Sequence, residues 1–242
     1  FWHYYFPIMV GNTTNEGAAI QQIQRFRRDW AGNFKQIVTD MIRDPVMQEM
    51  LSLNRNTKQH PNENFARKLL ELYTLGVGYY TEKDIREAAR AFTGYRTIRR
   101  LNWFLIWWPD HDFGEKTFLG QTGHWNGDDI IEIVFQQPRT AEFVVEKLWK
   151  EFISPTPDPL RVKQFAKQFS QDWDIKKILS TILKSNEFWQ EKNYQTLVKS
   201  PVDLAIGILK DSGVQSVKGN GLAAAVVVMG QFLYNPSEIM IC

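Results

Sequence analysis

The sequence predicts a mainly α-helical, multi-helical single domain with one small β-hairpin or irregular flap. Helical spacing of apolar residues, with recognisable caps, recurs through most of the 242 residues. Only the stretch 95–127 departs clearly from it. A hydrophobic content of 43% is enough for one sizeable core at this length. We therefore interpret residues 1–242 as one domain.

The first quarter of the chain predicts three helices and a loop. Ala18–Trp30 and Asn33–Arg43 carry helical periodicity and are separated near Gly32. Asp44-Pro45 begins a short third helix, because proline suits the first helical turn. Leu53–Pro61 has no periodicity and predicts a loop.

A helix, tight turn, helix unit follows this loop. Asn62 is the expected N-cap of a helix over Glu63–Leu75, which the turn Gly76-Val77-Gly78 ends. Thr81 is the expected cap of a second helix over Glu82–Phe92. Because the turn is short, the two helices are expected to pack side by side.

Residues 95–127 predict the β part, and helices resume after it. Tyr95–Pro109 is rich in β-branched and aromatic residues, whereas Asp110–Gly127 is rich in Gly, Asp and Thr. A small hairpin or an irregular flap fits both stretches. The later helices are expected at Asp128–Gln136, Thr140–Phe152, Leu160–Phe169, Ile175–Leu183, Pro201–Lys210 and Leu222–Leu233.

An aromatic cluster, Trp103–Trp108, lies within the β part. Such side chains usually supply packing area, so the preferred interpretation places them in the core. The alternative is a surface that contacts a partner or a missing segment, because large exposed apolar patches mark contact surfaces.

Composition excludes several classes of protein. Lys and Arg number 29 against 27 Asp and Glu, so the net charge of +2 gives no electrostatic reason to expect nucleic acid or an anionic membrane as partner. No apolar run is long enough for a transmembrane helix. The only cysteine, Cys242, excludes an internal disulfide and a multi-cysteine metal site. The start at Phe1 without methionine or leader leaves export open.

A narrow polar stripe runs along the first helix of the pair. At about 100° per residue its members fall within roughly 80° of one another. The second helix repeats the arrangement with Arg86, Arg90 and Thr93 on one side. The stripe could consist of ion pairs that only stabilise the helix, by about 0.2 to 0.5 kcal/mol each, or it could hold groups in place for a ligand. Its members are Glu63, Arg67, Glu71 and Thr74.

Two histidines are candidates for chemistry. His111 lies between Asp110 and Asp112, whose carboxylates favour a protonated ring or orient it for a metal. His3, in an aromatic run, could be a ligand, a base or a core histidine. A mixed nitrogen and oxygen ligand set would suit a divalent metal such as Zn, Mn or Fe, although no spacing rule joins its members. That set is His3, Glu63, His111 and Asp112.

Ordered motifs extend over nearly the whole chain, from Phe1 to about Tyr234. They are Phe1-Trp2-His3, Asn54-Arg55-Asn56, Pro61–Arg67, Leu69–Gly78, Tyr80–Glu82, Ala88–Gly94, His111-Asp112, Lys116–Gly120, Lys147–Trp149 and Lys199–Pro201. In their order they resemble the bacterial DUF1800 family. The polar residues that match family motifs are His3, Glu63, Asn64, Arg67, Glu71, Thr74, Glu82, Arg90, Thr93, His111, Asp112 and Lys116.

The resemblance implies a setting more than an activity, because the family has no established function. Its members look like exported bacterial proteins, often encoded beside a sulfatase-like protein. It therefore implies a periplasmic or extracellular location and a possible sulfatase-like protein partner; oligomeric state is open. The chain departs from the family at Tyr4 and Tyr5, where a second histidine is usual. It departs again at Ser237–Cys242, so we expect parts at both ends to be missing.

Two functions are weighed. The first is a hydrolase-like or metal-assisted site, with His111, Asp112, Glu63 and Arg67 as catalytic residues and His111 acting as ligand or general base held by Asp112. In it a second group binds the ligand: Arg90, Glu71, Asn64 and Lys116. The alternative is a non-catalytic envelope or extracellular binding or assembly module, in which the polar network is structural and the aromatic flap meets a partner.

Overall fold

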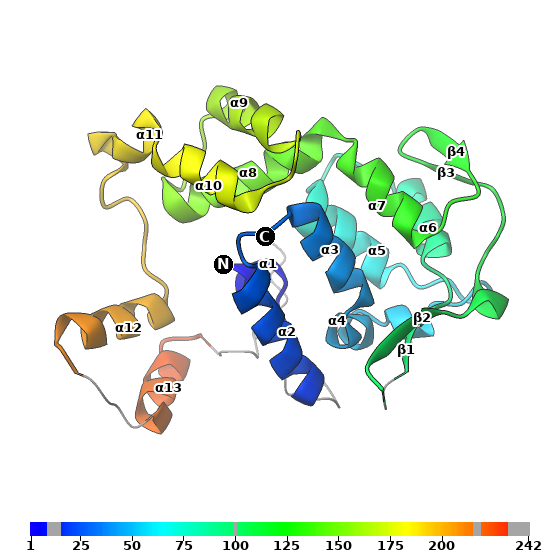
Figure 1. Cartoon of the computed structure of the whole chain (residues 1–242), viewed down its shortest axis with the longest axis horizontal. Coiled ribbons are helices and arrows are strands. Elements are labelled where there is room, and N and C mark those ends of the chain that lie inside the picture. Colours follow the sequence, from blue (N-terminus) through cyan, green and yellow to red (C-terminus); the bar gives the residue numbers. More distant parts are fainter. Residues whose placement is uncertain (9–15, 99–100, 215–218, 232–242) are drawn as a thin grey trace.

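The computed structural model describes residues 1–8, 16–98, 101–214 and 219–231, and it confirms a mainly helical protein with only small β elements. Helices α3, α5, α6 and α7 lie side by side, and α8, α9 and α10 form a second group across one end of them (Figure 1). The helices before the β part are α1 Trp2–Tyr5, α2 Glu16–Asp29, α3 Phe34–Arg43, α4 Pro45–Met50, the 3-10 helix η2 Leu53–Arg55, α5 Asn64–Lys68, the π-helix η3 Leu69–Thr74 and α6 Glu82–Ala91.

Three of the predicted caps start their helices where the sequence placed them, but α5 begins at Asn64 with Glu63, and not Asn62, at its N-cap position. Asn33 Oδ1 accepts a hydrogen bond from Gln36 N at the start of α3, and Asp44 accepts from two amides at the start of α4. Thr81 and Asp84 form a reciprocal capping box that starts α6. After the β part the helices are α7 Gly127–Phe135, α8 Pro138–Phe152, α9 Pro159–Phe169, α10 Ile175–Leu183, α11 Asn186–Trp189, the 3-10 helix η5 Glu191–Asn193, α12 Pro201–Asp211 and α13 Gly219–Val228.

The first helix of the predicted pair differs from expectation. Instead of one α-helix over Glu63–Leu75, α5 continues as the π-helix η3, and the hydroxyl of Thr74 donates to the Leu69 carbonyl at 2.7 Å. The wider turn changes the angular position of every later side chain, so the spacing of 100° per residue fails beyond Lys68. Thr74 is fully buried and does not belong to the polar stripe.

The β part consists of two separate hairpins. Strand β1 Tyr95–Ile98 pairs antiparallel with β2 Trp103–Ile106, in a register that sets Tyr95 opposite Ile106. The 3-10 helix η4, Trp108–Asp110, follows β2. Strand β3 Lys116–Phe118 then pairs with β4 Gln121–Gly123, so the stretch predicted as possible irregular flap contains a second hairpin.

Gly94 fixes the first hairpin to the end of α6. Its amide donates to the Asn56 carbonyl at 2.9 Å, and its carbonyl accepts from Trp107 N at 2.7 Å. Gly94 has a φ of +83°, and a Cβ built there would lie 2.6 Å from the Trp107 carbonyl oxygen. Only glycine meets both conditions without strain. The two ends of the hairpin are therefore held at one point of the helical body.

Phe34 lies at the centre of the aromatic core. Its side chain is fully buried at the start of α3. Rings from α1, α7, α9 and the segment before α10 surround it, with centroids 5.7 to 6.5 Å away. These rings bring segments together that are far apart in the sequence. They are Trp2, Tyr5, Phe135, Phe169 and Trp173.

Helices α12 and α13 pack on each other, away from the main body, and an extended segment joins them to α11 (Figure 1). The sequence predicted both helices but neither α11 nor η5. Of the predicted last helix, residues 232–233 lie outside the described part of the chain. Within the described residues, no helix is both long and apolar enough to cross a membrane.

Candidate functional site

The predicted site residues form two clusters, both of which use α6. The Asp112 network comprises Arg90, Thr93, His111, Asp112 and Lys116. The Arg67 cluster comprises Glu63, Arg67 and Glu82. The loop after η4 packs against the C-terminal end of α6 and not against the part of α5 that carries Glu63 and Arg67.

Asp112 ties the loop to α6. Arg90 Nε donates to Asp112 Oδ2 at 2.7 Å, and Arg90 also pairs with Glu87, three residues earlier, at 2.7 Å. The other carboxylate oxygen accepts from Gly114 N at 2.8 Å. Burial is the largest single influence and would raise the pKa of Asp112, but the hydrogen bonds from Arg90 and Gly114 together with the charges of Arg90 and Lys116 outweigh it, so the pKa lies below its ordinary value. Both oxygens of the Asp112 carboxylate therefore already accept hydrogen bonds.

Lys116 holds the loop from the inside. Its side chain is 1% exposed at the start of β3, and Nζ donates to the carbonyl oxygens of Asp112 at 2.5 Å and Gly114 at 3.0 Å. Burial lowers the pKa of this amine, while the charge of Asp112 acts in the opposite direction. An ammonium that serves two backbone carbonyls stabilises a loop shape, and it has little freedom to bind a ligand.

Thr93 connects the end of α6 with the loop. Its hydroxyl donates to the Arg90 carbonyl at 2.7 Å and accepts from Asp112 N at 2.8 Å. Its own carbonyl contacts Nδ1 of His111 at 2.9 Å. The short segment after α6 therefore positions both residues of the His111-Asp112 motif.

His111 is held in one tautomer. A carbonyl oxygen can only accept, so Nδ1 carries the proton toward Thr93 and the neutral ring has its lone pair on Nε2. Burial is the main cause that lowers the pKa of His111. The ring lies edge-on to Trp108 and Phe113, with centroids 5.4 and 4.9 Å away. The expectation that Asp112 orients the imidazole is corrected, because the Asp112 carboxylate binds Arg90 and the Thr93 carbonyl orients the ring.

Nε2 of His111 is the one ring atom left for chemistry. Among the described residues, only Nδ1 of this ring makes a hydrogen bond, and the whole residue is 3% exposed.

The Arg67 cluster is more open. Arg67 donates to both carboxylate oxygens of Glu82 at 2.9 and 2.7 Å and to Glu63 at 3.1 Å. The hydrogen bond with Glu82 is the main cause that raises the pKa of Arg67 above its ordinary value. Each of the three side chains is at least 36% exposed. Solvent therefore screens these ion pairs.

Two further predicted ligand-binding residues lie outside both clusters. Glu71, on η3, makes no ion pair with Arg67 within the described residues; the partners of Arg67 are Glu63 and Glu82. Asn64 contributes its backbone amide to Asn62 Oδ1 at 3.0 Å, and its side chain is exposed.

The four predicted metal ligands are not assembled into one site. In the ranges that the structure describes, no group of three or more His, Cys, Asp or Glu side chains is arranged to hold a metal ion. His3 lies on α1, edge-on to Phe26 at 5.4 Å, and burial lowers its pKa. Glu63 belongs to the Arg67 cluster. Only His111 and Asp112 share a site, and their side chains face different partners.

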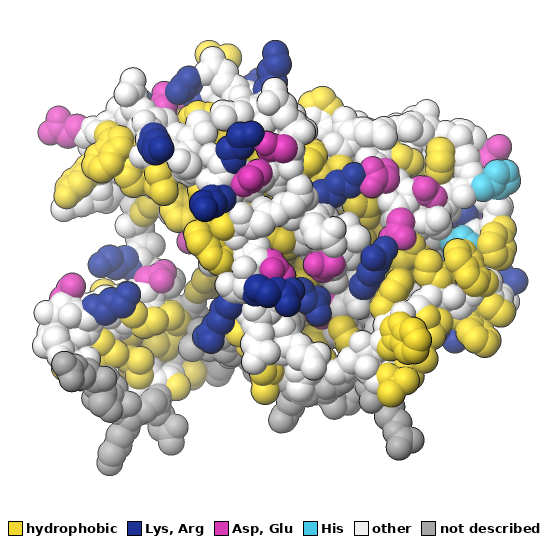
Figure 2. Space-filling model, viewed as in Figure 1, with side chains coloured by type: hydrophobic (Ala, Val, Ile, Leu, Met, Phe, Trp, Pro, Cys, Tyr) yellow, Lys and Arg dark blue, Asp and Glu magenta, His cyan; other side chains and the backbone are white. Residues whose placement is uncertain are grey.

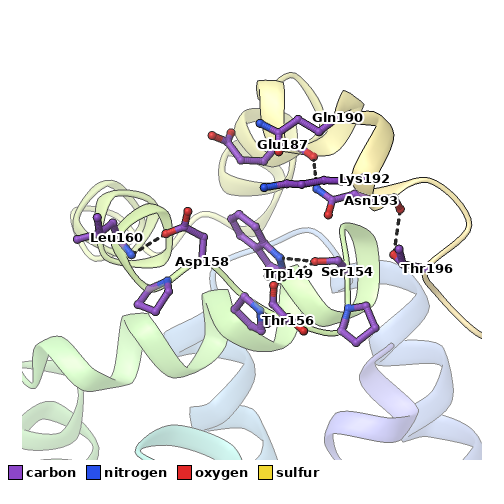
Figure 3. A pocket seen from close by; sticks show the side chains of 13 residues that line it. Trp149, Ser154, Thr156, Asp158, Leu160, Glu187, Gln190, Lys192, Asn193 and Thr196 are labelled. Atoms are coloured by element: carbon purple, nitrogen blue, oxygen red, sulfur yellow. Dashed lines mark hydrogen bonds between the residues drawn. The ribbon is translucent and has the colours of Figure 1, made fainter.

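A surface pocket is lined by other residues. It measures about 640 Å³ and is enclosed by the end of α8, the start of α9 and the α11–η5 region (Figure 3). Asp158 in its wall caps α9, and Glu187 pairs with Arg161, so both acidic side chains are engaged. None of the predicted site residues lines it.

Sequence reasoning missed the partners that complete the Asp112 network. Glu87 was not singled out, although its spacing of three residues from Arg90 on a predicted helix was a usable signal. The contacts of His111 with Trp108 and Phe113 had no comparable signal, because they depend on the path of the loop.

The three tryptophans of the aromatic cluster are exposed. Trp103 is 66% exposed, and Trp107 and Trp108 are each 48% exposed. The preferred expectation of core packing is wrong for these three side chains. Phe104 does face inward. The centroid of its ring is 5.4 Å from that of Tyr95, and the guanidinium of Arg43 lies over the ring. The alternation of strand residues separates the two faces of β2.

These features define a mainly helical protein with two small hairpins and a self-paired polar network beneath an exposed aromatic surface. The chain belongs to the family described as "Protein of unknown function (DUF1800)", whose model matches residues 1–239. Searches among curated proteins and among solved structures returned no match.

Proposed function

We propose that this protein is a non-catalytic binding module whose contact surface is the aromatic surface of the first hairpin and the loop after it. This surface consists of Ile98, Leu101, Trp103, Trp107, Trp108 and Phe113, all exposed. Exposed aromatic side chains at this density are typical of interfaces. The polar network beneath them has the role of a support.

The observation that carries this proposal is that the polar groups beneath the aromatic surface already bind one another or the backbone. The carboxylate of Asp112, the guanidinium of Arg90 and the amine of Lys116 bind one another or nearby backbone. A ligand would have to displace these hydrogen bonds. A network that only supports the loop, in contrast, is stable because its polar groups are satisfied. The exposed aromatic side chains, in contrast, can contact a partner without breaking any of these hydrogen bonds.

A pull-down from extracts of the source cells tests the contact surface. The variant Trp107→Ala/Trp108→Ala should recover much less of any bound partner than the wild type. Trp189→Ala is the matched control, because Trp189 is exposed on α11. The sulfatase-like protein implied by the resemblance is the first candidate to seek. Equal recovery by the double variant and the control would reject this surface.

The state of His111 favours a second candidate, a hydrolase-like or metal-assisted site. A neutral imidazole with its proton fixed on Nδ1 and its lone pair on Nε2 has the form required of a general base or a metal ligand. In this candidate His111 acts, Asp112 and Lys116 shape the loop, and Arg90 positions Asp112. Glu63, Arg67, Glu71, Asn64 and His3 would need to join from outside this cluster.

Metal analysis of the purified protein tests this candidate. A stoichiometric metal that is lost in both His111→Asn and Glu63→Gln would support the ligand set, provided that circular dichroism is unchanged. Loss in His111→Asn alone would restrict the site to the loop. Equal metal content in wild type and His111→Asn would remove His111 as a ligand.

A further inference from the structure

We infer that the pocket between α8, α9 and the α11–η5 region binds a small aromatic carboxylate, whose charge pairs with Lys192. The site is independent of the aromatic surface of the first hairpin. Figure 2 shows hydrophobic side chains gathered over the β1–β2 end of the molecule, whereas basic and acidic side chains lie among apolar ones over α8–α11. The pocket has a volume of about 640 Å³, which suits a small organic molecule.

One wall of the pocket is largely apolar and poor in hydrogen-bond donors. Between α8 and α9 the chain reads Ser154-Pro-Thr-Pro-Asp-Pro159, so every second residue lacks a backbone N–H. Trp149 and Leu160 line the same wall, and Leu160 is 74% exposed. An aromatic ring can pack against such a wall, but the wall offers an anion few donors.

The opposite wall carries the polar groups, with Lys192 as its cation. Among the described residues that line the pocket, Lys192 is the only Lys or Arg. Its ammonium makes no hydrogen bond or ion pair with any part of the chain that the structure describes. Figure 3 shows its side chain extending along the pocket toward Trp149 and Asp158. The ammonium is therefore left for a ligand.

The two acidic residues of the pocket are engaged elsewhere. Glu187 Oε1 lies 2.6 Å from Arg161 Nε, and Oε2 accepts from Nη2 of the same side chain at 3.0 Å. The hydrogen bond from Arg161 is the main cause that lowers the pKa of Glu187. Asp158 Oδ1 accepts from the amides of Leu160 and Arg161 at the start of α9, where the positive end of the helix offsets its charge. Neither carboxylate therefore pairs with Lys192.

The contrast between the two walls selects an anion with an apolar body. Inorganic phosphate needs several donors and would leave the proline wall in contact with water. A carboxylate on an aromatic ring suits both walls, because the carboxylate accepts from Lys192 while the ring packs on the prolines. The Gln190 side chain, which has no hydrogen-bond partner among the described residues, can donate to the second carboxylate oxygen.

Both walls are held in place by their own hydrogen bonds. Trp149 Nε1 donates to Ser154 Oγ at 3.0 Å, and the Ser154 hydroxyl donates to the Thr156 carbonyl at 3.1 Å. Across the pocket, Asn193 Nδ2 donates to the Glu187 carbonyl at 2.7 Å (Figure 3). The pocket therefore does not have to be ordered on binding, which lowers the entropic cost.

Calorimetric titration of the whole chain with benzoate and its uncharged analogue benzamide tests this inference. The wild type should bind benzoate on the order of tenfold more tightly than benzamide, because only benzoate forms a charge-assisted hydrogen bond with Lys192. Lys192→Gln should lose about tenfold in affinity for benzoate and keep the affinity for benzamide. Leu160→Ala should weaken the binding of both by about threefold, because it removes apolar contact area.

The matched control is Lys83→Gln, which removes an exposed lysine from α6 and should bind both compounds as the wild type does. Circular dichroism should show that every variant is folded. No saturable binding of benzoate to the folded wild type at millimolar concentrations would overturn the inference. So would equal benzoate affinities of Lys192→Gln and Lys83→Gln. Binding of inorganic phosphate as tight as that of benzoate would also contradict it, because the apolar wall would then contribute nothing.

Discussion

The Asp112 network and the Arg67 cluster use the same kinds of side chain, but they occupy different environments. Arg90 and Asp112 are each less than 30% exposed and connect α6 with a loop about twenty residues away in sequence. Arg67, Glu63 and Glu82 are all at least 36% exposed and connect two helices that a tight turn already joins. The difference teaches that burial and sequence separation, more than the number of ion pairs, decide what a charged cluster contributes.

The largest expected effect on stability is that of Gly94→Ala, next to the Asp112 network. The matched variant next to the Arg67 cluster is Gly78→Ala. Gly94→Ala should lower the free energy of unfolding by about 3 to 4 kcal/mol, because it adds a left-handed backbone cost to a clash with the Trp107 carbonyl. Gly78→Ala should cost only about 1 kcal/mol, because φ is also positive there but the space around it is open. Urea denaturation of both variants measures the difference. Similar midpoints for the two would contradict the assigned role of the hairpin base.

The second effect concerns the carboxylates. Asp112→Ala should destabilise the protein by about 2 kcal/mol, since Arg90 and Gly114 N both lose their acceptor in a partly buried site. Glu82→Ala, in the open cluster, should leave the urea midpoint nearly unchanged. If Glu82→Ala proves as harmful as Asp112→Ala, the contrast between the clusters is wrong.

An intermediate effect is expected in the pH dependence of stability. Folding lowers the pKa of His111, so below pH 6.5 the unfolded chain binds a proton more readily than the folded protein does. The contribution of His111 to the free energy of unfolding is complete above pH 6.5. It is lost as the pH falls from there toward the lower pKa of the folded state. The stability difference between wild type and His111→Asn should therefore shrink on acidification.

Melting temperatures of both proteins at pH 7.5 and at stepwise lower pH values measure this difference. Asparagine is the chosen replacement because its amide can keep the hydrogen bond to the Thr93 carbonyl. Parallel pH profiles for the two proteins would show that His111 is not buried as described.

The smallest expected effect is in the open cluster itself. Arg67→Ala should cost about 0.5 kcal/mol or less at low salt, and this cost should diminish further at high salt, because exposed pairs are screened. Thermal unfolding at two salt concentrations measures it. A large cost that is insensitive to salt would place Arg67 among the buried, structural arginines.

Local patterns were enough to predict most of the helices. Asn33, Asp44 and Thr81 cap the helices that they were expected to start, since capping depends on residues within a few positions. The π-helical turn after Lys68 could not be predicted in this way. A wider turn leaves no distinct local pattern, and Thr74 is fully buried instead of lying on the predicted stripe.

The sequence selected residues of the candidate site but did not predict which of them contact one another. Arg90, His111, Asp112 and Lys116 were all selected, and they do lie together. The partner of the His111 ring was predicted to be its neighbour Asp112, whereas it is Thr93, because the loop doubles back on the end of α6. Adjacent residues in an extended segment point in different directions, so adjacency in sequence is weak evidence for contact between side chains.

The sequence by itself determined the helical class of this protein, its caps and its family, because these depend on short-range patterns and on ordered motifs. Only the tertiary structure decided which charged groups close on one another, and that the tryptophans of the first hairpin face solvent. Burial and the local field depend on distances in space, which a linear sequence does not contain.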